Sequence, residues 1–216
     1  MADEIDRTSR PRRQTGPKRR DKRELLTRKR AGVVAGAAVF GFTLGVLAAV
    51  VGADRWDDGG STGSPEQALA AAGCTSETFP DEGGTHVESY DAKVKYDSFP
   101  PTSGPHYVRP VIWGRYQDAI PAVAEAHNLE HGGVIVQYGD KIGATARMRL
   151  RVFYDDSPNA MILAPLPELG SKMTLTAWTH LATCKRFDES AFSAFRSAYR
   201  GKGPERFPID DLAPGT

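Results

Sequence analysis

The sequence predicts a small α+β domain, with a mainly antiparallel sheet and a packed C-terminal helix, preceded by one N-terminal transmembrane helix. Residues 31–53 contain no charged side chain. Short apolar runs bounded by Gly, Pro, Asp and Asn recur between residues 134 and 178, as expected for strands. A capped amphipathic segment follows at residues 188–201. The chain of 216 residues has room for one ordinary domain plus these accessories.

The first 30 residues form a strongly basic tail. They contain 12 Lys and Arg against 5 Asp and Glu, and so carry +7. The whole chain has 28 basic and 27 acidic residues, which leaves 16 and 22 for the remainder, a charge of −6. This composition is typical of a disordered arm that sets membrane topology, with contact to anionic lipid headgroups as the alternative. No aromatic residue lies among these charges, so we expect no nucleic-acid partner.

Residues 31–53 are expected to cross the cell membrane once. A helix of this length extends about 34 Å, enough for a hydrocarbon core of about 30 Å. A cleaved signal peptide is the alternative, but this apolar run is longer than its usual core of 7–15 residues. The basic flank predicts a cytoplasmic N-terminus, because Lys and Arg are enriched on that side. The rest of the chain is therefore expected outside the membrane.

The outward part begins with a linker rich in Asp, Gly and Ser at residues 54–63. The folded domain is expected over residues 64–205, followed by a tail at 206–216. Ser64 is placed to cap a first helix, with Gln67 at the capping-box position and Gly73 as its end.

Four short runs rich in β-branched or aromatic residues are expected as strands. They cover residues 134–138, 149–154, 160–164 and 173–178. Asp188 caps a final helix in which Phe187 and Phe192 have the spacing of a hydrophobic staple, and Gly201 ends it. Long irregular segments between residues 75 and 132 are expected to cover one edge of the sheet.

The two cysteines, Cys74 and Cys184, both lie on the outward side. An even number in an oxidising compartment favours a disulfide, and its loop of 110 residues would bracket the domain. A pair of thiolate metal ligands is the alternative, although neither cysteine lies in a Cys-x-x-Cys motif.

Four of the five histidines, His86, His106, His127 and His131, fall between residues 86 and 131. Pro100, Pro101 and Pro105 restrain the loop that presents His106. We expect His106, His127 and His131 to bind a transition metal, with His86 as a fourth ligand and Glu130 as a ligand or as the acceptor behind one. Imidazole-rich sites suit zinc or copper.

The segment His127-Asn-Leu-Glu130-His131 also fits the H-x-x-E-H pattern, in which Glu130 would be the catalytic base of a metallohydrolase. Gly132 and Gly133 argue against this function, because a zincin needs a sustained helix. Two further alternatives lack a metal. One is a pocket with the aromatic neighbours Tyr107, Trp113, Tyr116 and Tyr138, and the other is a structural or partner-binding module of the cell envelope.

Two motifs stand out around these histidines, Pro100-Pro-Thr-Ser-Gly-Pro-His106 and His127-Asn-Leu-Glu-His-Gly132, the second leading into residues 134–138. Together with the flanking cysteines, they resemble the family called domain of unknown function 3105. The resemblance covers about residues 74–205. It implies one membrane anchor and an extracytoplasmic domain, and it implies no particular reaction.

Overall fold

The computed structural model describes residues 63–216. The predicted basic tail, the predicted transmembrane helix at residues 31–53 and almost all of the linker lie outside the described residues. Among residues 63–216, no helix is both long and apolar enough to span a membrane.

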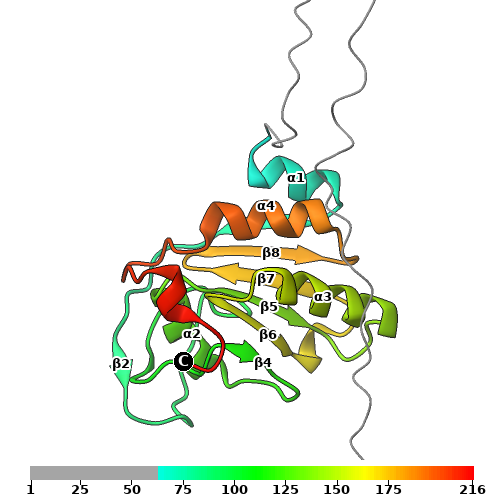
Figure 1. The fold of residues 1–216 in the computed structure, drawn as a ribbon. Coiled ribbons are helices and arrows are strands. Elements are labelled where there is room, and N and C mark those ends of the chain that lie inside the picture. Colours follow the sequence, from blue (N-terminus) through cyan, green and yellow to red (C-terminus); the bar gives the residue numbers. More distant parts are fainter. Residues whose placement is uncertain (1–62) are drawn as a thin grey trace, which may run out of the picture. The chain divides into compact units, whose positions relative to one another are not determined.

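A six-stranded sheet forms the centre of the domain (Figure 1). Its strand order is β1-β8-β7-β5-β6-β4. Three neighbouring pairs are antiparallel, whereas β6 runs parallel to both β5 and β4. The strands are Thr75–Thr78 (β1), Gly114–Arg115 (β4), Val134–Tyr138 (β5), Met161–Pro165 (β6), Met173–Ala177 (β7) and His180–Cys184 (β8). The predicted α+β class and mainly antiparallel sheet are confirmed.

The predicted strand at residues 149–154 is wrong, because this segment belongs to helix α3, Ala144–Asp156. The buried residues Leu150, Phe153 and Tyr154 recur at helical spacing, while Met148 and Val152 are exposed. The helix connects the parallel strands β5 and β6, a connection that two-residue turns cannot make. Polar and apolar side chains alternate over Arg149–Val152, and this pattern is typical of a half-buried strand.

The sheet is buried on both faces because alternate strand residues enter two different cores. Val134 and Val136 of β5 pack in a core that includes residues of α3 and of α4, Glu189–Tyr199. Ile135, between them, packs in a second core with Leu129 and Trp113. Strand β5 is therefore apolar almost throughout, as its sequence Val-Ile-Val indicated.

The predicted end elements are confirmed. Helix α1, Pro65–Ala71, has the full capping box at Ser64 and Gln67. The Asp188 carboxylate accepts a hydrogen bond from the Ala191 backbone N–H at 2.9 Å, and the rings of Phe187 and Phe192 lie 4.8 Å apart. Cys74 and Cys184 form a disulfide, which ties the segment before β1 to the end of β8.

Residues 206–216, expected as a tail, contain the 3-10 helix η2, Ile209–Leu212. Leu212 is buried in the second core, and its carbonyl accepts a hydrogen bond from Ala160. Trp113 exchanges backbone hydrogen bonds with Gly215 and Thr216. This segment thus packs on the same side of the sheet as Leu129 and Trp113.

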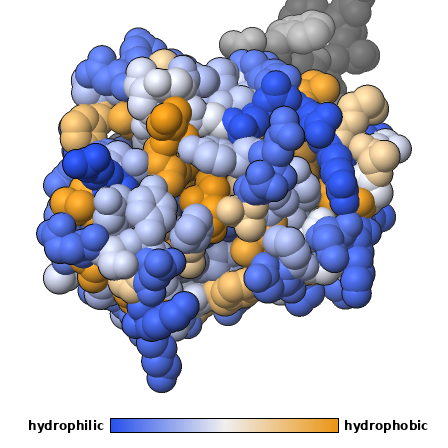
Figure 2. Space-filling model, turned by 90° about the horizontal axis from the view of Figure 1, so that it is seen from below, coloured by the Kyte–Doolittle hydropathy of each residue, from blue (hydrophilic) through white to orange (hydrophobic). Residues whose placement is uncertain are grey.

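Helix α2, Ala122–Glu130, also contributes to this second core, and beside it lies a two-stranded parallel sheet of β2, His86–Val87, and β3, His106–Tyr107. Another 3-10 helix, η1, covers Pro167–Leu169. Seen from below the view of Figure 1, the surface is mostly hydrophilic, with hydrophobic residues in separate patches (Figure 2).

Candidate metal centre

Helix α2 carries two of the predicted site residues, His127 and Glu130, one turn apart. The sequence predicts irregular segments between residues 75 and 132. Much of this range is irregular, but the prediction is wrong for residues 122–130, which form α2. Helix α2 is buried from Val123 to Glu130, so it lacks the polar face that identifies a surface helix. His131 ends the helix and Gly132 takes a positive φ of 84°. The glycine pair terminates the helix, as expected, but only after it has positioned His127 and Glu130.

The other residues of the His-Asn-Leu-Glu-His motif have structural roles. The Asn128 side chain is fully buried and makes two hydrogen bonds of 2.9 Å with the backbone N–H and carbonyl of Val111. Leu129 is fully buried in the second core. Their contacts fix the rotation of α2, so that His127 and Glu130 face the β2–β3 pair.

The Pro-Pro-Thr-Ser-Gly-Pro segment is a rigid support for His106. Thr102 and Ser103 are fully buried, and Ser103 holds residues 80–82 through hydrogen bonds with Pro80 and Glu82. Gly104 has a φ of 107°, which disfavours other residues there. The parallel pairing of β2 with β3 then sets His86 beside His106.

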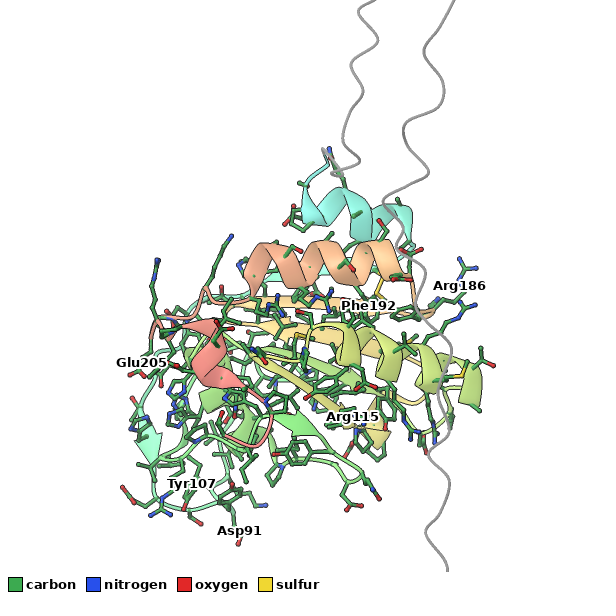
Figure 3. The ribbon with its side chains drawn as sticks, in the orientation of Figure 1. Asp91, Tyr107, Arg115, Arg186, Phe192 and Glu205 are labelled. Atoms are coloured by element: carbon green, nitrogen blue, oxygen red, sulfur yellow. A yellow bond between two sulfur atoms is a disulfide. The ribbon has the colours of Figure 1, made fainter. Side chains whose placement is uncertain are left out.

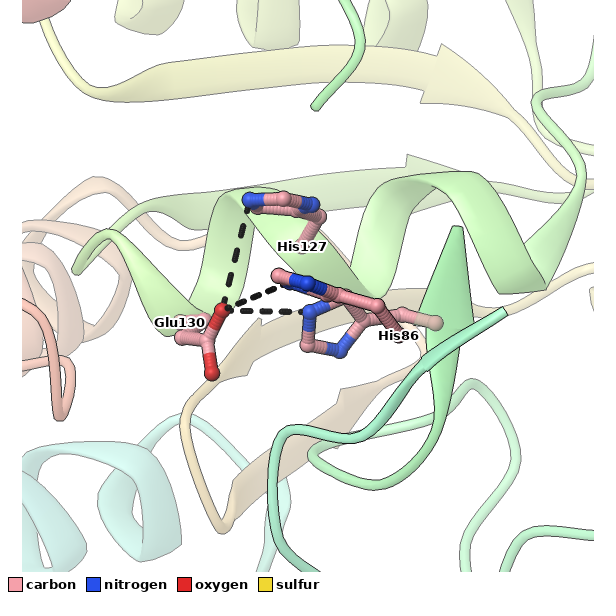
Figure 4. A group of neighbouring side chains, drawn as sticks. His86, His127 and Glu130 are labelled. Atoms are coloured by element: carbon pink, nitrogen blue, oxygen red, sulfur yellow. Dashed lines mark hydrogen bonds and ion pairs between the residues drawn. The ribbon is translucent and has the colours of Figure 1, made fainter. Parts of the chain in front are cut away.

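Three imidazoles point their Nε2 atoms at one oxygen of Glu130, as Figure 4 shows for His86 and His127 beside the carboxylate. The distances to Oε2 are 3.1 Å from His106, 3.8 Å from His86 and 4.0 Å from His127. His106 is fully buried, whereas the His86 side chain is 43% exposed. The cluster is therefore buried on the protein side and reaches solvent at His86.

Backbone carbonyls fix the orientation of two of these rings. His106 Nδ1 lies 2.9 Å from the Gly104 carbonyl, and His127 Nδ1 lies 2.8 Å from the Tyr107 carbonyl. A carbonyl only accepts, so each Nδ1 carries the proton and donates it. In a neutral ring, Nε2 then carries a lone pair. This is the arrangement that proteins use to prepare histidines as metal ligands. Nε2 of His106 lies 3.1 Å from Glu130 Oε2, whereas Nε2 of His127 lies 4.0 Å from that oxygen and 3.1 Å from His131 Nε2.

Burial keeps the rings on α2 neutral. Desolvation is the main cause that lowers the pKa of His127, and the neighbouring imidazoles lower it further. The hydrogen bond to Tyr107 and the charge of Glu130 act in the opposite direction and are smaller in total. Desolvation and His127 likewise lower the pKa of His131. Neutral imidazole is the form that binds metals.

His131 lies beside the cluster and belongs to a second group with Glu130 and Glu205. Its Nε2 is 3.1 Å from His127 Nε2 and 3.2 Å from Glu205 Oε2. Glu205 was not predicted, because an isolated glutamate after the last helix carries no local signal. It is brought here by backbone hydrogen bonds from Gly201 to Gly132 and from Glu205 to Glu130.

The donor set fits a transition metal. One ligand atom from each of His86, His106, His127 and Glu130 lies within 4.8 Å of the others. Tetrahedral zinc with ligands at about 2.0–2.1 Å separates them by roughly 3.3 Å, so only small shifts are required. Gly84 packs against Glu130, and a Cβ there would lie 1.9 Å from Oε1. A side chain at this position would displace the carboxylate.

The four predicted pocket aromatics do not come together. The Tyr107 ring lies 4.2 Å from that of Tyr90 in a tilted arrangement, and Trp113 is buried in the second core. Tyr116 and Tyr138 instead line a different cleft, away from the histidines. The prediction grouped these residues because they are close in the sequence. Residues that are close in the sequence need not be close in space when irregular loops connect them.

Further along α2, Glu125 forms a buried pair with Gln137 of β5, whose amide donates to Glu125 Oε2 at 2.8 Å. Desolvation raises the pKa of Glu125 to about 8. Gln137 Oε1 has no hydrogen-bond partner among the described residues. The raised pKa favours the neutral form of the Glu125 carboxyl group at pH 7.

The fold and the cluster together define an α+β domain with a centre of histidines and a glutamate. The chain belongs to the family described as "Protein of unknown function (DUF3105)", whose model matches residues 86–209. That range starts at His86 and includes every residue of the centre, Glu205 among them. A search of curated proteins and a search of solved structures each gave no match.

Proposed function

We propose that this domain binds one transition metal ion, zinc or copper, through His86, His106 and His127 with Glu130 as the fourth ligand. The observation that supports it best is the convergence of three Nε2 atoms on one carboxylate oxygen. His106 Nε2 lies 3.1 Å from this oxygen, and both side chains are buried. A metal ion bound between them would be coordinated by both atoms.

The ligand types limit the choice of metal. Imidazole and carboxylate bind zinc and copper well, and the described residues place no thiolate in the centre, because both cysteines form the disulfide. The exposed edge of His86 gives the ion a route from solvent, whereas His106 and Glu130 are covered. Such a site suits a protein that holds or transfers a metal at the cell envelope.

We further infer a single-pass location in the cell membrane, with a cytoplasmic N-terminus and the metal centre outside. The uncharged segment 31–53 and its basic flank support this inference, and the disulfide agrees with an oxidising compartment. Delivery of a metal would require a partner protein in the envelope. The basic tail would lie against anionic lipid headgroups.

A metallohydrolase is less well supported by the geometry. Its base must stand beside a metal-bound water, but Glu130 Oε2 lies at the point where the three imidazoles meet. This position suits a ligand. A module without metal would need another reason for the convergence of three imidazoles on one buried carboxylate.

The test is elemental analysis of the full chain, purified in detergent and equilibrated with zinc or copper. We expect near-stoichiometric metal in the parent and its loss in a His106→Ala, His127→Ala double variant. His180→Ala is the matched control, because His180 lies on β8 with Thr78 and Tyr199 and outside the centre. Absence of metal from the parent would contradict the proposal and favour a scaffold or partner-binding domain.

A further inference from the structure

A second site lies between α3 and the strands β4 and β6, in a cleft of about 890 Å³. None of the four clustered histidines lines it. We call it the arginine cleft and define it by six of its lining residues, Arg115, Tyr116, Tyr138, Arg147, Arg151 and Tyr154.

The cleft is positively charged within an acidic part of the chain. Its lining contains three arginines and one carboxylate, Asp155, whereas residues 31–216 as a whole carry −6. Asp155 lies 3.5 Å from Arg115 and neutralises that residue. Within residues 63–216, neither Arg147 nor Arg151 has an ion pair. The arginine cleft thus has two uncompensated guanidinium groups.

Two buried donors in the cleft have no hydrogen-bond partner. Tyr154 is 4% exposed, and its hydroxyl is unpaired. Nε of Arg147 is also buried and unpaired, although another nitrogen of the same group donates to the Asp140 carbonyl at 2.7 Å. Folded proteins rarely leave buried polar groups unpaired. Both groups can donate, so the oxygen of an anion would satisfy either of them.

We propose that the arginine cleft binds a small soluble oxyanion, a phosphate or a carboxylate. Guanidinium groups recognise both by paired hydrogen bonds. Two of them are already held over aromatic rings, Arg147 at 5.8 Å from the Tyr138 ring centroid and Arg115 at 5.8 Å from that of Tyr154. Tyr116 and Leu163 add surface for an organic group attached to the anion.

Calorimetric titration of the full chain in detergent, with inorganic phosphate and separately with citrate, tests this proposal. Sodium chloride keeps the ionic strength constant, because salt screens exposed charges. We expect saturable binding of at least one anion, and the anion that binds assigns the phosphate or the carboxylate class. An Arg147→Gln, Arg151→Gln double variant should bind at least tenfold more weakly. An Arg149→Gln, Arg186→Gln variant loses the same charge outside the cleft and should bind normally.

Tyr154→Phe distinguishes a binding role from a purely structural one. Removing an unpaired buried hydroxyl should leave the Tm unchanged or raise it without anion, and should reduce the Tm increase that the anion produces. Metal content should not change in any of these variants, which separates this test from that of the metal centre. Failure of both anions to bind, or equal weakening in both double variants, would overturn the proposal.

Discussion

The histidine centre and the arginine cleft differ in how completely the protein satisfies their polar groups. Figure 3 labels one residue near each site, Glu205 beside the histidine centre and Arg115 at the arginine cleft. At the histidine centre, the outer nitrogens of His106 and His127 are held by backbone carbonyls, and only the inner nitrogens face one another and Glu130. In the arginine cleft, the side chains extend from α3 and from the edge strand β4, and two buried donors are unpaired. This difference is what we expect if the first site binds a cation of fixed geometry and the second binds an anion.

The largest effect on stability should come from the disulfide, which belongs to neither site. A Cys74→Ser, Cys184→Ser variant loses a link across 110 residues, and the chain-entropy model gives a loss of about 4–5 kcal/mol in the free energy of unfolding. Urea denaturation measures this loss. The folded variant should still bind metal and anion with unchanged affinity. Loss of metal from the folded variant would mean that the centre depends on β1 and β8, contrary to our account.

The next largest effect is the increase in stability that ligand binding produces, and it should differ between the two sites. A ligand at a thousand times its Kd stabilises the native state by about 4 kcal/mol, and at ten times its Kd by about 1.4 kcal/mol. We expect zinc to approach the first value and phosphate the second, because four ligand atoms of the metal centre already lie within 4.8 Å of one another, whereas the arginine cleft offers exposed guanidinium groups such as that of Arg115. Thermal unfolding with each ligand, and with a chelator as control, measures the difference. Equal Tm shifts at the same free concentration would contradict the comparison.

A pH effect should follow from Glu125, on the helix that carries two of the proposed ligands. Its pKa of about 8 exceeds that of an unfolded glutamate, so the unfolded state loses this proton first and stability falls as pH rises from about 4.5 to 8. Over the part of this range below pH 7, the loss is up to about 3 kcal/mol. Glu125→Gln should flatten the dependence, while Glu77→Gln, at an exposed position on β1, should not. Denaturation at pH 5 and pH 7 measures both.

The smallest effect should come from the contact that brings Glu205 to His131. A Cβ at Gly203 would lie 2.1 Å from the Glu130 carbonyl oxygen, so Gly203→Ala should destabilise by about 1–3 kcal/mol and weaken metal binding moderately. Gly143→Ala has nothing within 4 Å of the new Cβ and is the control. Unchanged metal affinity in Gly203→Ala would show that the Glu205 pair does not support the centre.

The sequence predicted the elements whose signals are local. The capping box at Ser64, the cap at Asp188 and the apolar run at residues 134–138 each determine their own segment, and all three are confirmed. Helix α2 was not predicted. Its residues are buried on every side, so the sequence lacks the alternation of polar and apolar faces that identifies a surface helix. The sequence predicted a strand within helix α3 because residues 149–152 alternate between polar and apolar side chains. The helical spacing of buried residues becomes visible only over the full 13 residues of the helix.

The candidate centre was predicted only in part, because some of its residues are marked by local sequence signals and others are not. The sequence predicted His106, His127 and His131 as ligands, with His86 and Glu130 beside them. The structure brings a ligand atom of each except His131 within 4.8 Å of the others, and it places His131 in the neighbouring group with Glu130 and Glu205. The grouping of His131 with Glu205 depends on a backbone contact between residues 201–205 and the end of α2, which no local pattern encodes. The arginine cleft combines residues of β4, β5 and α3 and is equally non-local.

X-ray absorption at the metal edge of the zinc-loaded full chain tests the central claim most directly. Our account predicts one metal per chain with a shell of nitrogen and oxygen at about 2.0–2.1 Å and the scattering of three imidazoles. His106→Ala should reduce the imidazole number, and His180→Ala should not. A shell without imidazole, or one that His106→Ala leaves intact, would contradict the account.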